Sequence, residues 1–257
     1  MVLKNNKSLG QHWLKDRATL DAIADYSCIF DTNLCIEIGP GLGTLTSSLL
    51  KCFDKVIAVE YDSRLAENLP KSFPGKNLEV INMDFLKFNL ESIKEPYAVA
   101  GNIPYYITSP IITKLLETEN RPQRIVLLIQ KEVAERIAAK DGKETVLSLS
   151  VKNRADVELG PVVKRELFTP PPKVDSQVII LDPHPPIVSE EVIKLVKRGF
   201  SAPRKKLKKN LGLDEATTLA AFTSATSSKT GGPLPIDARP ADLSLEDWQS
   251  LYDALNK

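Results

Sequence analysis

The chain has 257 residues, of which 42% are hydrophobic and 26% charged, with a formal net charge of +1 at pH 7. This composition is typical of globular proteins, and no apolar run reaches the roughly 18 residues of a membrane-spanning helix. The first residues also lack the apolar core of a secretory signal peptide. We therefore expect a cytoplasmic protein without a membrane partner, and the length favours one large domain with a smaller one.

Cysteine and histidine are scarce. Cys28, Cys35 and Cys52 lack the spacing of a zinc site and indicate buried thiols in a reducing compartment. His12 and His184 are the only two histidines. We therefore expect no metal site.

The first half of the chain alternates between helical and strand patterns. A helix is predicted over 16–30, with Asp16 as its N-terminal cap. The remaining predicted elements are strands at 34–39, 55–62, 78–84, 97–102 and 124–130, and helices at 44–52, 63–71, 107–117 and 131–140. Such alternation predicts an α/β fold with a doubly wound, Rossmann-like sheet.

Three later segments, 146–153, 155–160 and 176–181, have strand-like patterns and would complete this sheet. The proline-rich stretch 182–186 breaks the composition, so we predict domains at 1–182 and 183–257. The second is predicted to be small and all-α, with helices within 190–200, 203–211, 214–223 and 244–255. A Ser/Gly/Pro-rich connector, 224–235, lies between the last two of these helices.

A glycine-rich turn follows the first predicted strand, with glycine at positions 39, 41 and 43. Glycines let the chain bend tightly and let a ligand approach the backbone, although such a turn is equally typical of a purely structural bend. The dinucleotide pattern G-x-G-x-x-G is absent because Thr44 occupies its last position. The E-x-G-x-G-x-G spacing from Glu37 instead resembles the turn of S-adenosylmethionine-dependent methyltransferases, which makes Gly39 and Gly41 candidate cofactor-binding residues.

Two carboxylates close the next two predicted strands. Glu60 ends the second strand, where it can accept hydrogen bonds from both ribose hydroxyls of a nucleoside cofactor, and Asp84 ends the third, where it can accept the adenine amino group. Each alone is also typical of a polar strand end. Together with the glycine turn they predict a cofactor pocket, because ligands bind at the carboxyl edge of open α/β sheets.

The tetrapeptide Asn102-Ile103-Pro104-Tyr105 follows the fourth strand. The Asn102 amide oxygen and the Ile103 carbonyl can accept the two N–H groups of an exocyclic amine, while Pro104 fixes the backbone and Tyr105 offers a face for stacking. A methyl group on a sulfonium is already activated, so its transfer is mainly a positioning task that needs no strong base. The alternative is a structural Asn-x-Pro turn.

A basic run spans 192–213 and contains no acidic residue. Such a run fits a nucleic-acid phosphate backbone, and it equally fits a solvated helix face. Its members are Lys194, Lys197, Arg198, Arg204, Lys205, Lys206, Lys208 and Lys209.

Eight blocks spread over the chain together carry a family resemblance: 8–16, 37–46, 56–62, 82–88, 101–110, 130–137, 167–176 and 199–211. In these blocks the chain resembles the ribosomal RNA adenine N6,N6-dimethyltransferases, and most closely their bacterial small-subunit branch. The resemblance implies an S-adenosylmethionine-dependent enzyme of ribosome biogenesis. It would dimethylate adenines in a hairpin of small-subunit (16S) rRNA, with that RNA or the 30S precursor as its partner. A monomer is our default expectation.

The resemblance also implies residue roles. His12 and Leu14 would close over the methionine end of the cofactor, in a pocket completed by Gly39, Glu60, Asp84 and Asn102. Phe168 would be the second stacking face for the target adenine. Lys173 and the basic residues Arg204, Lys205, Lys206, Lys208 and Lys209 would contact RNA. Trp13 stands where the family usually has Phe, and Thr145-Val146 replaces a common Tyr-Gly.

Three other functions remain open at this stage. The large-subunit (23S) rRNA adenine methyltransferases of macrolide resistance are similar through the cofactor motifs. A non-catalytic assembly or transcription factor would keep the fold and the RNA surface without the chemistry. A DNA adenine methyltransferase is the third alternative, because the basic run does not distinguish RNA from DNA.

Overall fold

The computed structural model describes residues 11–140 and 142–257, so residues 8–10 of the first family block lie outside the described part. Contacts divide the chain into two compact units. Unit 1 comprises the described part of Met1–Ala134 together with Asp156–Pro183, and unit 2 comprises Glu135–Ala155 and His184–Lys257. The predicted boundary between 182 and 183 lies beside Pro183, but the segment 135–155, assigned by sequence to the first domain, makes its contacts in unit 2.

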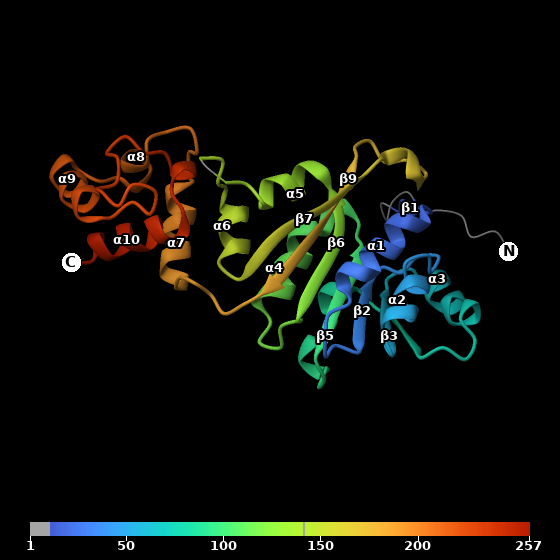
Figure 1. Ribbon diagram of the computed structural model, residues 1–257. Coiled ribbons are helices and arrows are strands. Elements are labelled where there is room, and N and C mark those ends of the chain that lie inside the picture. Colours follow the sequence, from blue (N-terminus) through green and yellow to red (C-terminus); the bar gives the residue numbers. More distant parts are fainter. Residues whose placement is uncertain (1–10, 141) are drawn as a thin grey trace. The chain divides into compact units, whose positions relative to one another are not determined.

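Unit 1 is built on a seven-stranded sheet of order β4-β3-β2-β5-β6-β9-β7. The strands from β2 to β6 are parallel, whereas β9 is antiparallel to β6. The doubly wound α/β fold predicted from the sequence is therefore confirmed, and the strand order reverses between β2 and β5 (Figure 1). The strands are β2 (Leu34–Ile38), β3 (Lys55–Glu60), β4 (Leu78–Asn82), β5 (Tyr97–Asn102), β6 (Arg124–Gln130), β7 (Ala155–Val163) and β9 (Ser176–Pro183).

The helices of this part of the chain are α1 (Arg17–Ser27), α2 (Thr46–Cys52), α3 (Ser63–Asn68), α4 (Thr108–Glu117) and α5 (Lys131–Ile137), of which α5 is divided between the two units at Ala134. Asp16 caps α1 as predicted, because its carboxylate accepts a 2.9 Å hydrogen bond from the Thr19 N–H. Buried residues of α1 and α2 share one apolar cluster with the inner strands β5, β6 and β9. Within the described residues, no helix is long and apolar enough to cross a membrane.

A second, two-stranded sheet ties the start of the described chain to a much later segment. Strand β1 (Trp13–Leu14) runs antiparallel to β8 (Phe168–Thr169), with Leu14 opposite Phe168. Both of these side chains are buried in the main core of unit 1. The pairing holds the first described residues against the loop that precedes β9.

One predicted strand is a helix. Residues 146–153 alternate in hydrophobicity, but α6 (Val146–Lys152) forms there. A capping box explains the difference, because the Thr145 hydroxyl accepts the Ser148 N–H at 3.0 Å and the Ser148 hydroxyl accepts the Thr145 N–H at 2.7 Å. Local capping thus stabilises a helical start that the alternating pattern does not reveal.

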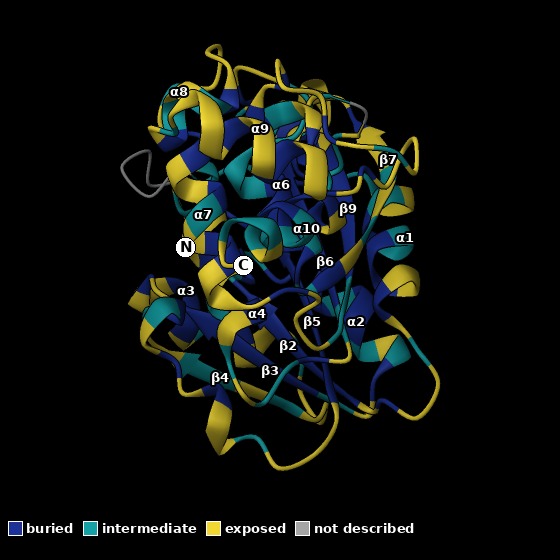
Figure 2. Ribbon diagram, turned by 90° about the vertical axis from the view of Figure 1, so that its left-hand side faces the viewer, coloured by how far each residue is buried: buried dark blue, intermediate teal, exposed yellow. Residues whose placement is uncertain are grey.

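Unit 2 is helical, as the composition beyond the proline-rich break predicts. Its core surrounds the fully buried Trp248, and the connector contributes to it through buried Leu234. Figure 2 colours much of α9 as exposed, with buried residues between the exposed ones. Its helices are α6, α7 (Glu190–Gly199), α8 (Leu207–Leu211), α9 (Glu215–Ser224) and α10 (Leu245–Leu255).

The three cysteines differ in their surroundings. Cys35 is buried in β2, but Cys52 is only partly buried and Cys28 is exposed at the end of α1. The expectation of buried thiols therefore holds for Cys35 alone.

Candidate functional site

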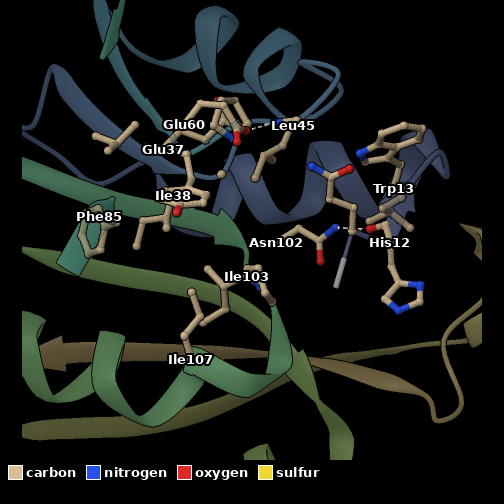
Figure 3. A pocket seen from close by; sticks show the side chains of 18 of the residues that line it. His12, Trp13, Glu37, Ile38, Leu45, Glu60, Phe85, Asn102, Ile103 and Ile107 are labelled. Atoms are coloured by element: carbon tan, nitrogen blue, oxygen red, sulfur yellow. Dashed lines mark hydrogen bonds between the residues drawn. The ribbon is translucent and has the colours of Figure 1, made fainter. Parts of the chain in front are cut away.

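A cavity of about 360 Å³ lies at the carboxyl edge of the parallel strands in unit 1, around the point where the strand order reverses. Figure 3 shows its lining, with side chains from the strand ends facing the β1 segment across the space. The structure brings ten predicted site residues to this one cavity. They are His12, Leu14, Gly39, Gly41, Glu60, Asp84, Asn102, Ile103, Pro104 and Tyr105.

The glycine turn after β2 requires glycine at the cavity wall. Gly39 and Gly41 have φ angles of +62° and +58°, in the left-handed region that other residues rarely adopt. A Cβ on Gly39 would meet nothing within 4 Å, whereas one on Gly41 would lie 3.3 Å from the Trp13 indole. The turn is therefore bare toward the cavity at Gly39 and covered by the β1 segment at Gly41.

Glu60, at the end of β3, is only 6% exposed. One carboxylate oxygen accepts the Gly41 N–H at 3.0 Å and the other accepts the Asp62 N–H at 2.8 Å. Burial raises the pKa of this carboxyl above its ordinary value, although the two backbone hydrogen bonds oppose that rise. Because each carboxylate oxygen has a second lone pair, Glu60 can still accept ligand hydroxyls while it holds the glycine turn.

Glu37 lines the same cavity, although the sequence reasoning used it only to define the glycine spacing. It is 1% exposed, and its carboxylate accepts a 2.6 Å hydrogen bond from the Thr46 hydroxyl. Burial raises the pKa of Glu37 to about 8. Glu37 could have been identified from the sequence as a site residue, because it is the first residue of the E-x-G-x-G-x-G pattern.

Asp84 follows β4 and caps the short 3-10 turn η3 (Phe85–Lys87). Its Oδ1 accepts the Leu86 N–H at 2.9 Å. That bond fixes the side chain and leaves the second carboxylate oxygen available to a donor in the cavity.

Asn102 ends β5, beside the point of strand reversal. Its Nδ2 donates a 2.9 Å hydrogen bond to the His12 backbone carbonyl, which Figure 3 draws as a dashed line. Only the amide nitrogen can donate to a carbonyl, so the bond fixes the amide orientation and leaves Oδ1 as an acceptor without a hydrogen-bond partner among the described residues. In this orientation the oxygen is available for the acceptor role that the sequence predicts, and that role stays a prediction.

Tyr105 is held from two sides. Its hydroxyl lies 2.7 Å from the Ser176 hydroxyl at the start of β9. The His12 ring lies nearly parallel to the Tyr105 ring, at 6.1 Å between centroids and 20° between planes. His12 in turn is fixed by a 2.8 Å hydrogen bond between its Nδ1 and the Pro170 carbonyl, which requires the hydrogen to be on Nδ1.

Other predicted residues lie away from the cavity wall. Phe168 is 2% exposed within the apolar core, so in this conformation it presents no face for stacking. Lys173 is exposed on the loop before β9, in unit 1. The basic residues of unit 2 surround the start of α8: Arg204, Lys205, Lys206 and Lys209 are exposed and Lys208 is half-buried. Lys206 pairs with Asp237 at 2.6 Å.

The cavity therefore combines two kinds of recognition. Carboxylates at the ends of β3 and β4 and the bare glycine turn suit a nucleoside with hydroxyl and amino donors. The fixed Asn102 amide and the Tyr105 ring suit a second, planar group that carries an amine. Two ligands bound in these two parts of the cavity would be held in a fixed orientation relative to each other. A group-transfer reaction requires such an arrangement.

Comparisons with known proteins match the whole chain. The family model described as "Ribosomal RNA adenine dimethylase" matches residues 2–256. Proteins named "Ribosomal RNA small subunit methyltransferase A" are similar over nearly full length. The one from Gloeobacter violaceus is 41% identical, with 97% of this chain and 93% of that protein covered, and the one from Nostoc sp. is 38% identical, with 99% of each covered.

Two solved structures are also similar. The 23S rRNA methyltransferase ErmE has a TM-score of 0.78 at 29% identity, with 95% of this chain and 100% of that chain covered. A dimethyladenosine transferase from Plasmodium falciparum has a TM-score of 0.76 at 29% identity, with 95% and 98% covered. Both the family model and the curated relatives cover nearly the full length, so the chain belongs to the ribosomal RNA adenine dimethylase family.

Proposed function

We propose that this enzyme transfers methyl groups from S-adenosylmethionine to N6 of adenines in a small-subunit (16S) rRNA hairpin, twice in succession. The observation that carries the proposal is the Asn102 amide beside the cavity, whose nitrogen donates to His12 and whose oxygen has no hydrogen-bond partner in the described part of the chain. The names of the full-length relatives support the small ribosomal subunit as the substrate.

The residues of the cavity fit S-adenosylmethionine. Glu60 would accept the ribose hydroxyls and the free oxygen of Asp84 the adenine amino group, while the bare wall at Gly39 admits close approach to the backbone. His12 and Leu14 would cover the methionine end from the β1 segment. When bound, the cofactor supplies an activated methyl group on its sulfonium.

The target adenine would be turned out of its RNA stack to reach this edge of the sheet. The Asn102 oxygen and the Ile103 carbonyl would accept the two N–H groups of its amine, which draws the nitrogen lone pair out of conjugation and orients it toward the methyl. Tyr105, held by Ser176, would stack on the base. The alkylated nitrogen releases its proton to water, so no side chain need act as a strong base.

We also propose that basic residues outside the cavity contact the RNA. Lys173 in unit 1 and Arg204, Lys205, Lys206, Lys208 and Lys209 in unit 2 would contact phosphates. Phe168 would provide a second stacking face only after leaving the core. We further propose that the enzyme is a cytoplasmic monomer that acts on the 30S precursor.

A labelled-methyl assay tests the proposed substrate. Small and large ribosomal subunits that lack the modification are incubated with the enzyme and methyl-labelled cofactor, and the modified nucleoside is identified by mass. We expect N6,N6-dimethyladenosine in small-subunit RNA. Preference for large subunits would instead support the second candidate function, which the structural similarity to ErmE favours, and no methylation of either would support a non-catalytic factor.

A further inference from the structure

Two successive tyrosines after β5 have different surroundings. Tyr105 is partly buried and hydrogen-bonded to Ser176. Tyr106 also lines the cavity but is 65% exposed. Among the described residues, its side chain has no hydrogen-bond or ring partner. Tyr106 therefore offers an exposed aromatic ring beside the acceptor half of the cavity, which is the part that contains Asn102 and Tyr105.

The local backbone explains why the two rings diverge. Both residues belong to the 3-10 turn η5 (Tyr105–Ile107), in which successive side chains are separated by roughly 120° around the axis. Because Tyr105 points toward β9 and the His12 ring, Tyr106 points elsewhere, outward at the cavity mouth. Pro104, directly before the turn, restricts the backbone that orients both rings.

The order of strands assigns Tyr106 to the acceptor half of the cavity. The cofactor-type carboxylates follow β3 and β4, at one end of the parallel sheet. Tyr106 follows β5, on the opposite side of the reversal point and next to Asn102. A group that enters toward the Asn102 amide therefore brings its nearest covalent neighbours past Tyr106.

Base flipping leaves a base beside the target adenine without one of its stacking partners. When an adenine leaves its stack, the adjacent base loses a stacking partner. Stacking of a base on an aromatic side chain contributes roughly 1–3 kcal/mol, equivalent to roughly 5- to 150-fold in a binding or rate constant. An exposed ring beside the acceptor pocket is suited to replace the partner that the flipped adenine removes.

We propose that Tyr106 is a substrate-positioning residue that stacks on the nucleotide next to the target adenine and stabilises the flipped state. This inference rests on the proposed function, since it requires an RNA acceptor. The Tyr105 ring would then stack on the target base, and the Tyr106 ring would stack on the neighbouring base. The ring, rather than the hydroxyl, carries the effect.

Single-turnover methyl transfer to unmodified small subunits tests this role. The variants are Tyr106→Phe, Tyr106→Trp and Tyr106→Leu, measured over a range of enzyme concentrations with saturating labelled cofactor. We expect Phe and Trp to stay within twofold of the unmodified enzyme. Leu should lower the ratio of maximal rate to half-saturating concentration by roughly 5- to 150-fold. Cofactor affinity, measured by calorimetry, should stay within twofold in all three.

A matched control uses Phe30, which is 93% exposed in the loop before β2, at the opposite, amino edge of the sheet. Phe30→Leu removes an exposed ring of similar size and should change neither methyl transfer nor cofactor affinity. The inference is overturned if Tyr106→Leu behaves like the unmodified enzyme, if Phe loses as much as Leu, or if the loss lies in cofactor affinity. If the unmodified enzyme itself fails to methylate small subunits, the proposed function fails first.

Discussion

At the scale of single residues, the Asn102 amide nitrogen donates to the His12 carbonyl, and we propose that its oxygen accepts from the target amine. Asn102→Asp tests this division, because a carboxylate keeps the acceptor but cannot donate to the His12 carbonyl. We expect repulsion between the two oxygens to displace the side chain and lower the rate of methyl transfer about 100-fold or more. The measurement is single-turnover transfer at saturating cofactor.

Asn102→Ala provides the comparison, since it removes donor and acceptor together. It should abolish transfer while leaving the affinity for RNA within a few-fold, because phosphate contacts dominate RNA binding. A rate for either variant equal to that of the unmodified enzyme would remove Asn102 from the mechanism.

Glu37 predicts a pH dependence of stability. Its pKa is about 8 in the folded protein against an ordinary 4.5, so between these values the folded state holds a proton that the unfolded state has released. The free energy of unfolding therefore falls as pH rises through this window, by at most about 1.4 kcal/mol per pH unit from this one group. Glu37→Gln, which keeps the shape without the charge, should lose this contribution.

The check is urea unfolding of both proteins at several pH values from 5 to 9, since other groups cancel in the difference. The variant should gain stability relative to the unmodified protein as pH rises, and the difference should level off above about pH 8. Parallel curves would show that Glu37 does not titrate in this range.

Local patterns predict part of this site. Glu60, Asp84 and Asn102 were identifiable because each ends or closely follows a strand of a parallel sheet, and such ends meet at one edge. The partners that orient these side chains could not be identified from local patterns, since the Asn102–His12 bond joins residues 90 positions apart. The burial of Phe168 was likewise not identifiable from local patterns, because Phe168 lies opposite Leu14 in the pairing of β8 with the distant β1.

At the scale of elements, Ser176 links the start of β9 to the turn after β5. Ser176→Ala removes the hydrogen bond to Tyr105, which contributes roughly 0.5–1.5 kcal/mol. We expect methyl transfer to fall about 2- to 10-fold as the ring loses its orientation, with cofactor affinity unchanged.

A double-mutant cycle with Tyr105→Phe separates orientation from other effects. Each substitution deletes the same bond, so the double variant should be little worse than either single variant. Fully additive losses would mean that the two hydroxyls act independently.

The strand predicted at 146–153 is wrong for a reason confined to one element. The alternating pattern indicated a strand, but two reciprocal hydrogen bonds between Thr145 and Ser148 stabilise a helical first turn. Capping chemistry outweighs a short alternating pattern here because the segment spans only seven residues.

At the scale of the whole molecule, the division into two units predicts separable losses. A Cβ on Gly199 would lie 2.9 Å from Leu207 and closer still to the Trp248 ring, in the core of unit 2. We expect Gly199→Ala to cost about 1–3 kcal/mol of unit 2 stability and to weaken binding to small subunits. Calorimetry should find cofactor affinity unchanged, because the cavity belongs to unit 1.

Gly232→Ala is the matched control in the same unit, since its Cβ would meet only Thr230 at an ordinary 3.7 Å. It should leave thermal unfolding and subunit binding unchanged. Equal losses from both substitutions would argue against the packing explanation.

The contact between the β1 segment and the loop before β9 can form only late in the synthesis of the chain. A chain is made from its amino end, and His12 is bound to Pro170, 158 positions later. At roughly 5–20 residues per second, roughly 8–30 s pass between the synthesis of these two residues. In the last part of that interval, after residue 102 has been added, Asn102 already exists, but the contact of His12 with Pro170 does not. We therefore expect the nascent chain to gain the complete site only after unit 1 is nearly complete.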